Sequence, residues 1–439
     1  MKTFVLLFMG YSTLAWAILP LPYPDEPWDT DELIQVTEKP DPRNIQGYSE
    51  LYSGGQLREM ELPKFENPSG TLGYIEGYTF RVPPELQSRV AFWKKIYTQY
   101  TSSQSVLHDT QNLDIVYGVV DTSHIETKRA SRRRIRRMVA HYLRDEKKKI
   151  VRNLLTLDGL HDRPLAIPMM LLPIFKQFVH LDSRDKFMRA VPYVRSQIGQ
   201  KDRIVKGFLY GGRYFKEMMD IFESYGVPKE LTRLTLVESG FDIDARSKVG
   251  ASGVWQFMRS TGKRYLRIDR AVDERNDPIL ATHAAAKLLR KNFEVLGSWP
   301  LAVTAYNHGR AGMAKAVQEL GTKELATIIK KFKSDTFGFA SSNFYASFLA
   351  ILEVERDYRK YFGKLLVDSP IEIGKAALPR EAAFAEVALA CSMKENDLEQ
   401  FNPALTRWVT SGRGKVPAGY ELKVPIENLD RCVSGFLNI

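Results

Sequence analysis

The fold is decided by the stretch VPKELTRLTLVESG, residues 227–240. Proline suits the first turn of a helix and glycine suits its end, so this stretch predicts a short helix between Pro228 and Gly240. At helical spacing Glu238 lies on the apolar face that carries Leu231 and Leu234. A carboxylate at the negative end of a helix, on an apolar face, is disfavoured, and both effects raise its pKa. Glu238 is therefore a candidate general acid, with a solvated helix-end glutamate as the alternative.

Two more stretches follow in order along the chain. ARSKVGASGVWQFM, residues 245–258, is a loop of small residues before an aromatic and amide cluster, and AYNHG occupies residues 305–309. Between them, residues 273–278 open another helix. Over roughly Val205 to Tyr358 the three motifs resemble the catalytic domain of the lytic murein transglycosylases of the SLT family. The resemblance implies a mainly α protein with a lysozyme-like, goose-type helical catalytic domain, expected at residues 205–362.

The resemblance also implies roles for single residues. Glu238 takes the place of the catalytic acid/base. The positions that line the sugar cleft in the family are here Ser247, Gly250, Ala251, Gln256, Phe257, Met258, Tyr306, Asn307 and Tyr345. Trp255 fits either stacking on a sugar ring or a place in the core. Two positions depart from the family pattern: Arg259 replaces a proline, and Ser341 replaces a glutamate four residues before Tyr345, so the contact of that glutamate is open.

The implied reaction needs a single carboxylate. The family cuts the β-1,4 bond between N-acetylmuramic acid and N-acetylglucosamine, and the C6 hydroxyl of the muramic acid closes on C1 to form a 1,6-anhydro ring. An ordinary glycosidase uses two carboxyl groups. Asp242 and Asp244 are close to Glu238 in sequence, but their spacing places neither across a cleft from it. A muramidase-type hydrolase on the same fold and a non-catalytic peptidoglycan-binding scaffold are the alternatives, and peptidoglycan glycan strands are the expected partner of each.

Composition and the first residues indicate an exported protein. The chain has 439 residues, 44% hydrophobic and 26% charged, which allows two or three domains. A short basic start, the apolar run Phe4 to Leu14 and Ala15-Trp16-Ala17 predict a signal peptide at residues 1–17 and a periplasmic location. No cysteine precedes Cys391, so no lipoprotein anchor is expected, and no later run predicts a transmembrane segment. Export argues against nucleic acid as a partner despite the net charge of +11.

The N-terminal part is predicted in two pieces. Residues 18–90 are rich in proline and glycine and are expected to be extended, whereas residues 91–204 are expected to be mainly helical, with one strand at 114–120. Helices expected at 165–187 and 206–225 would complete an elongated all-helical module. Residues 128–155 form an amphipathic helix with a strongly basic face. That face is either solvated or a site for an anionic surface, such as peptide-stem carboxylates or lipid head groups, with peripheral membrane association.

The C-terminal part, residues 368–439, is predicted to be a small α+β module. A helix, an Asn-Pro turn and a late strand resemble a LysM glycan-binding module, although the usual opening strand with Gly-Asp is not recognisable; a structural cap is the alternative. Cys391 and Cys432 are the only thiols, and export makes a disulfide between them plausible. The seven histidines form no ligand pattern, so neither a metal nor a cofactor is expected, and the protein is expected to be a monomer.

Overall fold

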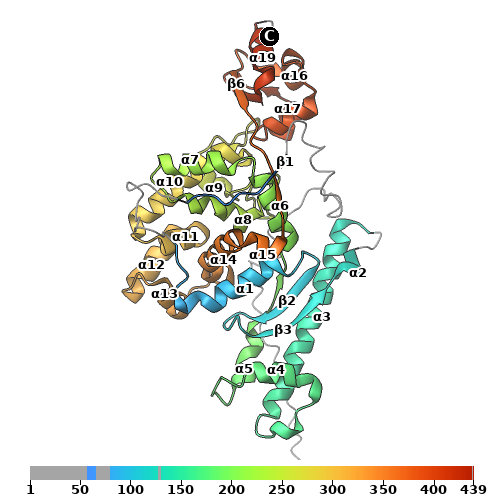
Figure 1. Cartoon of the computed structure of the whole chain (residues 1–439), viewed down its shortest axis with the longest axis vertical. Coiled ribbons are helices and arrows are strands. Elements are labelled where there is room, and N and C mark those ends of the chain that lie inside the picture. Colours follow the sequence, from blue (N-terminus) through green and yellow to red (C-terminus); the bar gives the residue numbers. More distant parts are fainter. Residues whose placement is uncertain (1–56, 66–79, 127–129, 438) are drawn as a thin grey trace, which may run out of the picture.

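The computed structural model describes residues 57–65, 80–126, 130–437 and 439. The predicted signal peptide and most of the proline-rich segment lie outside the described residues. Three hydrophobic cores divide the rest into an arm (residues 104–198), a helical body (84–100 and 201–368) and a C-terminal module (373–436). Figure 1 shows the three parts following one another along the longest axis, with the helical body in the middle. No helix in the described ranges is long and apolar enough to cross a membrane.

The helical body packs eleven α-helices of the described chain around one core, so the prediction of a mainly α, lysozyme-like domain is confirmed. Its central helix is α14, which is buried on most sides. The helices are α1 (Gln87–Thr98), α6 (Lys201–Gly211), α7 (Phe215–Ser224), α8 (Leu234–Ser239), α9 (Arg259–Gly262), α10 (Pro278–Leu296), α11 (Trp299–His308), α12 (Arg310–Leu320), α13 (Leu325–Lys331), α14 (Phe339–Arg356) and α15 (Tyr358–Phe362), with 3-10 turns at Pro84–Leu86, Lys229–Arg233 and Glu274–Asn276.

Helix α1 belongs to this body although the sequence pattern assigns it to the N-terminal region. It packs along α14, where Arg89 donates to Asn343 at 2.8 Å and Lys94 pairs with Glu353 at 2.6 Å. Further upstream, β1 (Leu57–Glu59) pairs with β5 (Leu366–Asp368), so the end of the segment expected to be a free extended lead is bound to the body. The two ends of the helical body are thus joined by contacts between residues far apart in sequence.

The prediction that residues 206–225 are helical is confirmed, but the chain forms two helices there, α6 and α7, with a break between them. Gly211 and Gly212 stand at the break. A Cβ on Gly212 would lie 2.7 Å from the carbonyl oxygen of Asp368 and 2.7 Å from the side chain of Val367. The break therefore lets strand β5 approach the backbone closely.

The arm contains a three-stranded antiparallel sheet in the order β3-β2-β4, so the expectation of an all-helical module is wrong. The predicted strand at 114–120 is confirmed as β3, and the basic helix is confirmed as α3, which packs on the sheet. In place of a continuous helix at 165–187 the chain forms the short helix α4 and 3-10 turns. The elements are β2 (Gln104–Asp109), β3 (Val116–Asp121), α2 (Ser123–Glu126), α3 (Arg132–Gly159), α4 (Leu172–Gln177), α5 (Lys186–Ala190) and β4 (Val194–Ile198), with 3-10 turns at Pro164–Ala166, Met169–Leu171 and Val191–Tyr193.

The C-terminal module combines two small sheets with four helices, as the predicted α+β composition requires. Strand β6 pairs with β9 and β7 with β8. The predicted helix and late strand are confirmed as α16 and β9, and Cys391 and Cys432 are disulfide-bonded. The elements are β6 (Ile373–Ala377), β7 (Ala382–Ala383), α16 (Phe384–Ala390), α17 (Glu395–Phe401), α18 (Arg407–Thr410), β8 (Lys415–Val416), β9 (Glu421–Pro425), the 3-10 turn Ile426–Asn428 and α19 (Leu429–Phe436).

Removing the disulfide should destabilise the C-terminal module alone. The double variant Cys391→Ser/Cys432→Ser opens a loop of 41 residues, and the free energy of unfolding of the module should fall by roughly 4 kcal/mol. Hydrogen exchange resolved by segment measures this, with faster exchange in α16 and α19. The helical body has its own core and serves as the internal control. Equal loss of protection in both parts would contradict the prediction.

Candidate functional site

Glu238 lies in the last turn of a short helix whose ends are those predicted from the sequence. Pro228 precedes the 3-10 turn Lys229–Arg233, α8 continues to Ser239, and Gly240 ends the helix in the left-handed region with φ 64°. Leu231 and Leu234 are fully buried beneath Glu238. The Glu238 side chain is half-buried rather than solvated, which excludes the alternative of an open helix-end glutamate.

Burial raises the pKa of Glu238 to about 8. Within the described part of the chain no residue forms a hydrogen bond or an ion pair with its carboxyl group, so nothing there offsets the loss of hydration. The Glu238 carboxylate interacts electrostatically with two tyrosines. The pKa of Tyr97 and that of Tyr306 are both raised, mainly by burial and further by the Glu238 carboxylate. A carboxyl group in this setting keeps its proton at neutral pH, as a general acid requires.

Tyr97 is the residue of this site that the sequence analysis missed. It stands on α1, is almost fully buried in the core of the helical body and interacts with Ser347 of α14. The pair Trp93 and Tyr97, four residues apart, marks one face of a helix in the sequence. Nothing in the local pattern indicates that this face packs beside Glu238, which follows more than a hundred residues later.

A buried ion pair holds the segment that leads into α8. Arg233 donates from Nε and Nη2 to the carboxylate of Glu355 on α14, at 2.8–3.0 Å, and both side chains are 2% exposed. The Arg233 guanidinium also lies 4.0 Å from the ring centroid of Phe215. Arg233, the residue directly before α8, is thereby bound to the central helix α14. This contact fixes where α8, the helix that carries Glu238, begins.

The loop 245–258 folds back on itself beside α8. Ser239 donates from its hydroxyl to the carbonyl oxygen of Val254 at 3.0 Å, which joins the two predicted motifs. Inside the loop the Ser247 hydroxyl accepts from the backbone N–H of Ala251 at 2.8 Å. The side-chain amide of Gln256 donates to the carbonyl oxygen of Gly253 at 2.8 Å, and Gln256 itself has φ 47°. A non-glycine residue in this region is strained and persists where the surrounding contacts enforce it.

Arg275, a buried residue of the segment that follows the loop, holds the loop in place. Its Nη1 donates to the carbonyl oxygens of Gly250 at 2.7 Å and Phe257 at 3.0 Å, while Asp273 pairs with the other side of the guanidinium at 2.7 Å. Residues 273–278, predicted to open a helix, do so through Asp277, which accepts from the first backbone N–H groups of α10. The segment therefore both starts α10 and fixes the loop.

Gly253→Ala should destabilise this loop much more than Gly250→Ala. A Cβ at Gly253 would lie 1.9 Å from the carbonyl oxygen of Arg275, and φ is 75°, whereas at Gly250, with φ 92°, a Cβ would meet no atom within 4 Å. Both variants bear the conformational cost of positive φ, about 1 kcal/mol, and only Gly253→Ala adds a backbone clash. Thermal unfolding of the two variants measures the difference; equal losses would mean that Arg275 moves freely.

The aromatic residues of the motifs divide into core and site. Trp255 is fully buried, stacks on Phe222 and donates to Thr282, so the core interpretation is the right one. Phe257 is 2% exposed and packs against Tyr306. The loop therefore turns this ring inward, and a contact between Phe257 and a substrate stays a prediction.

Tyr306 and Asn307 lie at the end of α11, next to the loop. Tyr306 donates from its hydroxyl to the carbonyl oxygen of Trp255 at 2.8 Å. Asn307 is exposed, and its side-chain oxygen accepts from the Ser341 hydroxyl at 2.8 Å. Ser341, which replaces the family glutamate, thus has a defined contact: it orients the amide of Asn307.

The remaining predicted residues differ in exposure. Met258 is 39% exposed at the end of the loop, and Gly250 is also exposed, whereas Ser247, Ala251 and Tyr345 are buried. Burial raises the pKa of the Tyr345 hydroxyl. The roles of these residues in binding stay predictions.

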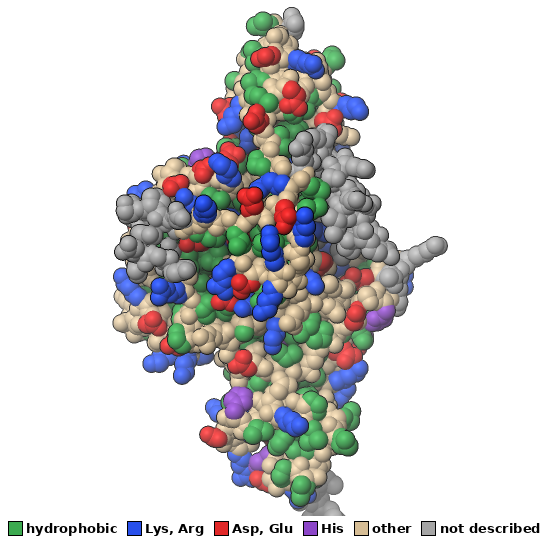
Figure 2. Space-filling model, in the orientation of Figure 1, with side chains coloured by type: hydrophobic (Ala, Val, Ile, Leu, Met, Phe, Trp, Pro, Cys, Tyr) green, Lys and Arg blue, Asp and Glu red, His purple; other side chains and the backbone are tan. Residues whose placement is uncertain are grey.

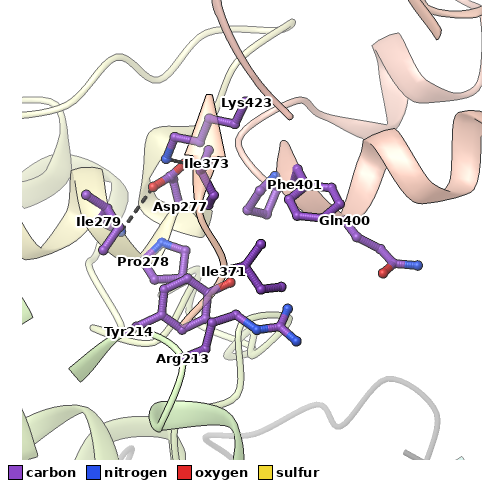
Figure 3. A pocket seen from close by; sticks show the side chains of 11 residues that line it. Arg213, Tyr214, Asp277, Pro278, Ile279, Ile371, Ile373, Gln400, Phe401 and Lys423 are labelled. Carbon is purple, nitrogen blue, oxygen red and sulfur yellow. Dashed lines mark hydrogen bonds and ion pairs between the residues drawn. The ribbon is translucent and has the colours of Figure 1, made fainter. Parts of the chain in front are cut away.

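A pocket lies at the junction of the helical body and the C-terminal module, apart from Glu238. Figure 3 shows it, with Lys423 of the module reaching Asp277 at the start of α10. Nearby, Asp273 donates from its backbone N–H to the carbonyl oxygen of Ala404 at 2.7 Å, and the Arg270 guanidinium lies 3.5 Å from the ring centroid of Trp408. The module is therefore bonded to the segment 270–277 that clamps the site loop.

Comparison with known proteins identifies the middle of this structure. Residues 218–329 match the family model of the Transglycosylase SLT domain, so this part of the chain is an SLT domain. Over 179 residues the chain is 29% identical to membrane-bound lytic murein transglycosylase D from two strains of Escherichia coli, covering 40% of this chain and 39% of each relative. It is 33% identical over 105 residues to a protein of Alteromonas sp. (strain M-1) named for tributyltin chloride resistance, covering 23% of this chain and 50% of that protein.

Proposed function

We propose, from the SLT domain at residues 218–329, that the protein is a peptidoglycan lytic transglycosylase. It cleaves the β-1,4 bond between N-acetylmuramic acid and N-acetylglucosamine and leaves a 1,6-anhydromuramic acid end. The observation that carries the proposal is the isolated, half-buried carboxyl group of Glu238, whose pKa is raised to about 8. Such a group is protonated before the reaction and can accept a proton afterwards.

Glu238 acts twice in the proposed reaction. It first donates its proton to the glycosidic oxygen while the bond from that oxygen to C1 of the muramic acid breaks. The C6 hydroxyl of the same sugar then bonds to C1, and its proton returns to the Glu238 carboxylate. Glu238 regains the proton that it donated, so the reaction needs no water molecule. Because the attacking hydroxyl is already part of the substrate, much of the entropic barrier to bringing it to C1 is offset.

The surroundings of Asp242 favour this reaction over hydrolysis. A hydrolase needs a second carboxyl group facing the first across the sugar. The pKa of Asp242 is raised to about 6 by burial and by the Asp244 charge, and the cations that influence it are Arg203 and Lys206. The groups that shift the pKa of Asp242 are thus Asp244, Arg203 and Lys206 and do not include Glu238, which supports a reaction in which Glu238 acts alone. A muramidase-type hydrolase remains the second candidate and is separated by its products.

The residues that we propose to bind substrate belong to the loop 245–258, to α11 and to α14. Gln256 is held at positive φ, and Tyr306, whose pKa the Glu238 carboxylate helps to raise, is bonded to the loop through its hydroxyl. Asn307 directs its amide N–H groups away from Ser341 and toward a ligand. The other proposed contacts are Ser247, Gly250, Ala251, Met258 and Tyr345. A non-catalytic scaffold would use the same residues to hold glycan strands without cleavage.

Location and accessory binding complete the proposal. The disulfide between Cys391 and Cys432 supports export, because such bonds persist in oxidising compartments. We place the enzyme in the periplasm as a monomer, with a signal peptide at residues 1–17. The C-terminal module, bonded to the segment that clamps the site loop, would hold glycan as a LysM-like module does.

Digestion of purified sacculi tests the proposed reaction. Mass spectrometry of the released fragments should find 1,6-anhydromuramic acid ends, which lack one water relative to hydrolysed ends. Reducing ends in place of anhydro ends would establish the hydrolase. Retention of the protein on sacculi with no released fragments would establish the scaffold.

A further inference from the structure

The far end of the arm carries apolar side chains in water. Leu165 is fully exposed, Met169 is 85% and Met170 is 80% exposed, and Val179 is also exposed. We call these four residues the apolar tip. Figure 2 shows hydrophobic side chains gathered at the lower end of the arm, away from the helical body. Contiguous exposed apolar side chains of this size mark a contact surface in a soluble protein.

The tip is a built structure. Between the exposed residues the chain turns Ile167, Leu171 and Ile174 inward, where each is less than 10% exposed in the core of the arm. Pro164 begins one 3-10 turn and Pro168 precedes the next, and each proline fixes its own backbone angle. Inward residues anchor the backbone, so Leu165, Met169 and Met170 are held outward.

Positive charge surrounds the tip. Arg163 and Lys176, which lie close to the tip residues in sequence, are both exposed. Two carboxylates in this part of the arm are in ion pairs, Asp162 with Arg184 at 3.1 Å and Asp185 with Arg189 at 3.7 Å, whereas Asp182 is exposed. From residue 132 to residue 190 the arm has fifteen Lys and Arg against six Asp and Glu. An anionic surface is the complement of this distribution.

We propose that the apolar tip inserts into the surface of a lipid bilayer that contains anionic head groups. Leucine and methionine side chains on a convex end reach the acyl boundary below the head groups, a depth of about 5–10 Å, while Arg163 and Lys176 stay at head-group level. The peptidoglycan wall offers carboxylates but little apolar surface, so it would leave Leu165, Met169 and Met170 in water. The proposal does not depend on the reaction at Glu238.

Vesicle flotation with the full chain tests the insertion. The protein should float with vesicles of equal parts phosphatidylcholine and phosphatidylglycerol, and bind pure phosphatidylcholine more weakly. The triple variant Leu165→Gln/Met169→Gln/Met170→Gln should bind on the order of 100-fold more weakly. The matched control is Leu389→Gln, which changes a side chain 81% exposed on the C-terminal module and should bind like the parent. Arg163→Gln/Lys176→Gln should lose about tenfold on anionic vesicles only.

A second reading separates insertion from surface adsorption. The variant Met170→Trp should shift its fluorescence emission to the blue on anionic vesicles, because the indole leaves water. Three outcomes would overturn the proposal. These are vesicle binding of the triple variant as tight as that of the parent, binding of the parent to sacculi but not to vesicles, and self-association of the protein through the tip in place of lipid binding.

Discussion

Glu238→Gln should release anhydro-muropeptides from sacculi roughly 1,000-fold more slowly than the parent enzyme. Glutamine keeps the shape of the side chain but has no proton to donate to the glycosidic oxygen. Burial raises the pKa of Glu238 to about 8, so the parent enzyme has that proton at neutral pH. Retention on sacculi should be unchanged, because the rest of the site is intact. The measurement is the rate of product release by mass spectrometry, with binding followed by co-sedimentation.

Asp242→Asn is the control for this result. Asp242 is another half-buried carboxyl group with a raised pKa, but its electrostatic partners are Asp244, Arg203 and Lys206. Its carboxylate accepts from the backbone N–H of Asp244 at 2.9 Å, and asparagine can accept the same bond. Release should stay within about twofold of the parent. A loss as large as that of Glu238→Gln would show that two carboxyl groups act, as in a hydrolase.

The substitution Glu238→Gln should also raise the stability of the folded protein. A loss of activity in this variant would therefore not result from a loss of folding. The pKa of Glu238 is 4.5 in its ordinary state and about 8 in the folded protein. As pH rises from 4.5 to 8 the unfolded chain ionises this group and the folded chain does not, so the parent loses stability over that window. Glu238→Gln avoids the loss and should gain on the order of 3 kcal/mol at pH 8 and nothing at pH 4. Urea unfolding at the two pH values measures the gain.

Arg233→Met should lower the free energy of unfolding by about 3–5 kcal/mol. The substitution leaves the Glu355 carboxylate buried without the guanidinium that now satisfies both of its oxygens. It also frees the residue directly before α8, so Glu238 should be less precisely placed and release should fall as well. Chemical denaturation of the helical body measures the change in stability.

Two further variants make this prediction specific. Arg233→Met/Glu355→Leu removes both charges and should recover most of the lost stability, because an apolar pair tolerates burial. Lys94→Met breaks the half-exposed pair between Lys94 and Glu353 and should cost at most about 1 kcal/mol. If the double variant were as unstable as Arg233→Met, the damage would come from lost packing of the arginine stem and the ion-pair explanation would be wrong.

Features that depend on neighbours in sequence were predictable. The helix around Glu238 follows from Pro228, Gly240 and the spacing of its leucines, because these act within one or two turns. The same holds for the basic helix α3, the strand β3 and the late strand β9. The raised pKa of Glu238 was also predictable in direction, since an apolar helix face predicts burial.

Features that depend on distant contacts were not predictable. Strands β2 and β4 pair although 84 residues separate the end of one from the start of the other, and neither has the alternating pattern of a half-buried strand. The inward turn of Phe257 depends on which residue covers it, and Tyr306, which does so, is 49 positions away. The periodicity of a sequence predicts whether a side chain is buried or exposed, but it does not predict which residues the side chain packs against.

The amino-acid sequence by itself determined the acid, its helix and the order of the motifs around it, because proline, glycine and apolar spacing act locally. Only the tertiary structure decided what surrounds that acid. Tyr97 comes from a helix assigned to another region, and Glu355 holds Arg233 from 122 positions away. The apolar tip of the arm is also evident only in the tertiary structure. Its exposed residues alternate with buried ones along short turns, and the helix expected at 165–187 does not predict this arrangement. Contacts across such separations form when the whole chain packs, and no short pattern records them.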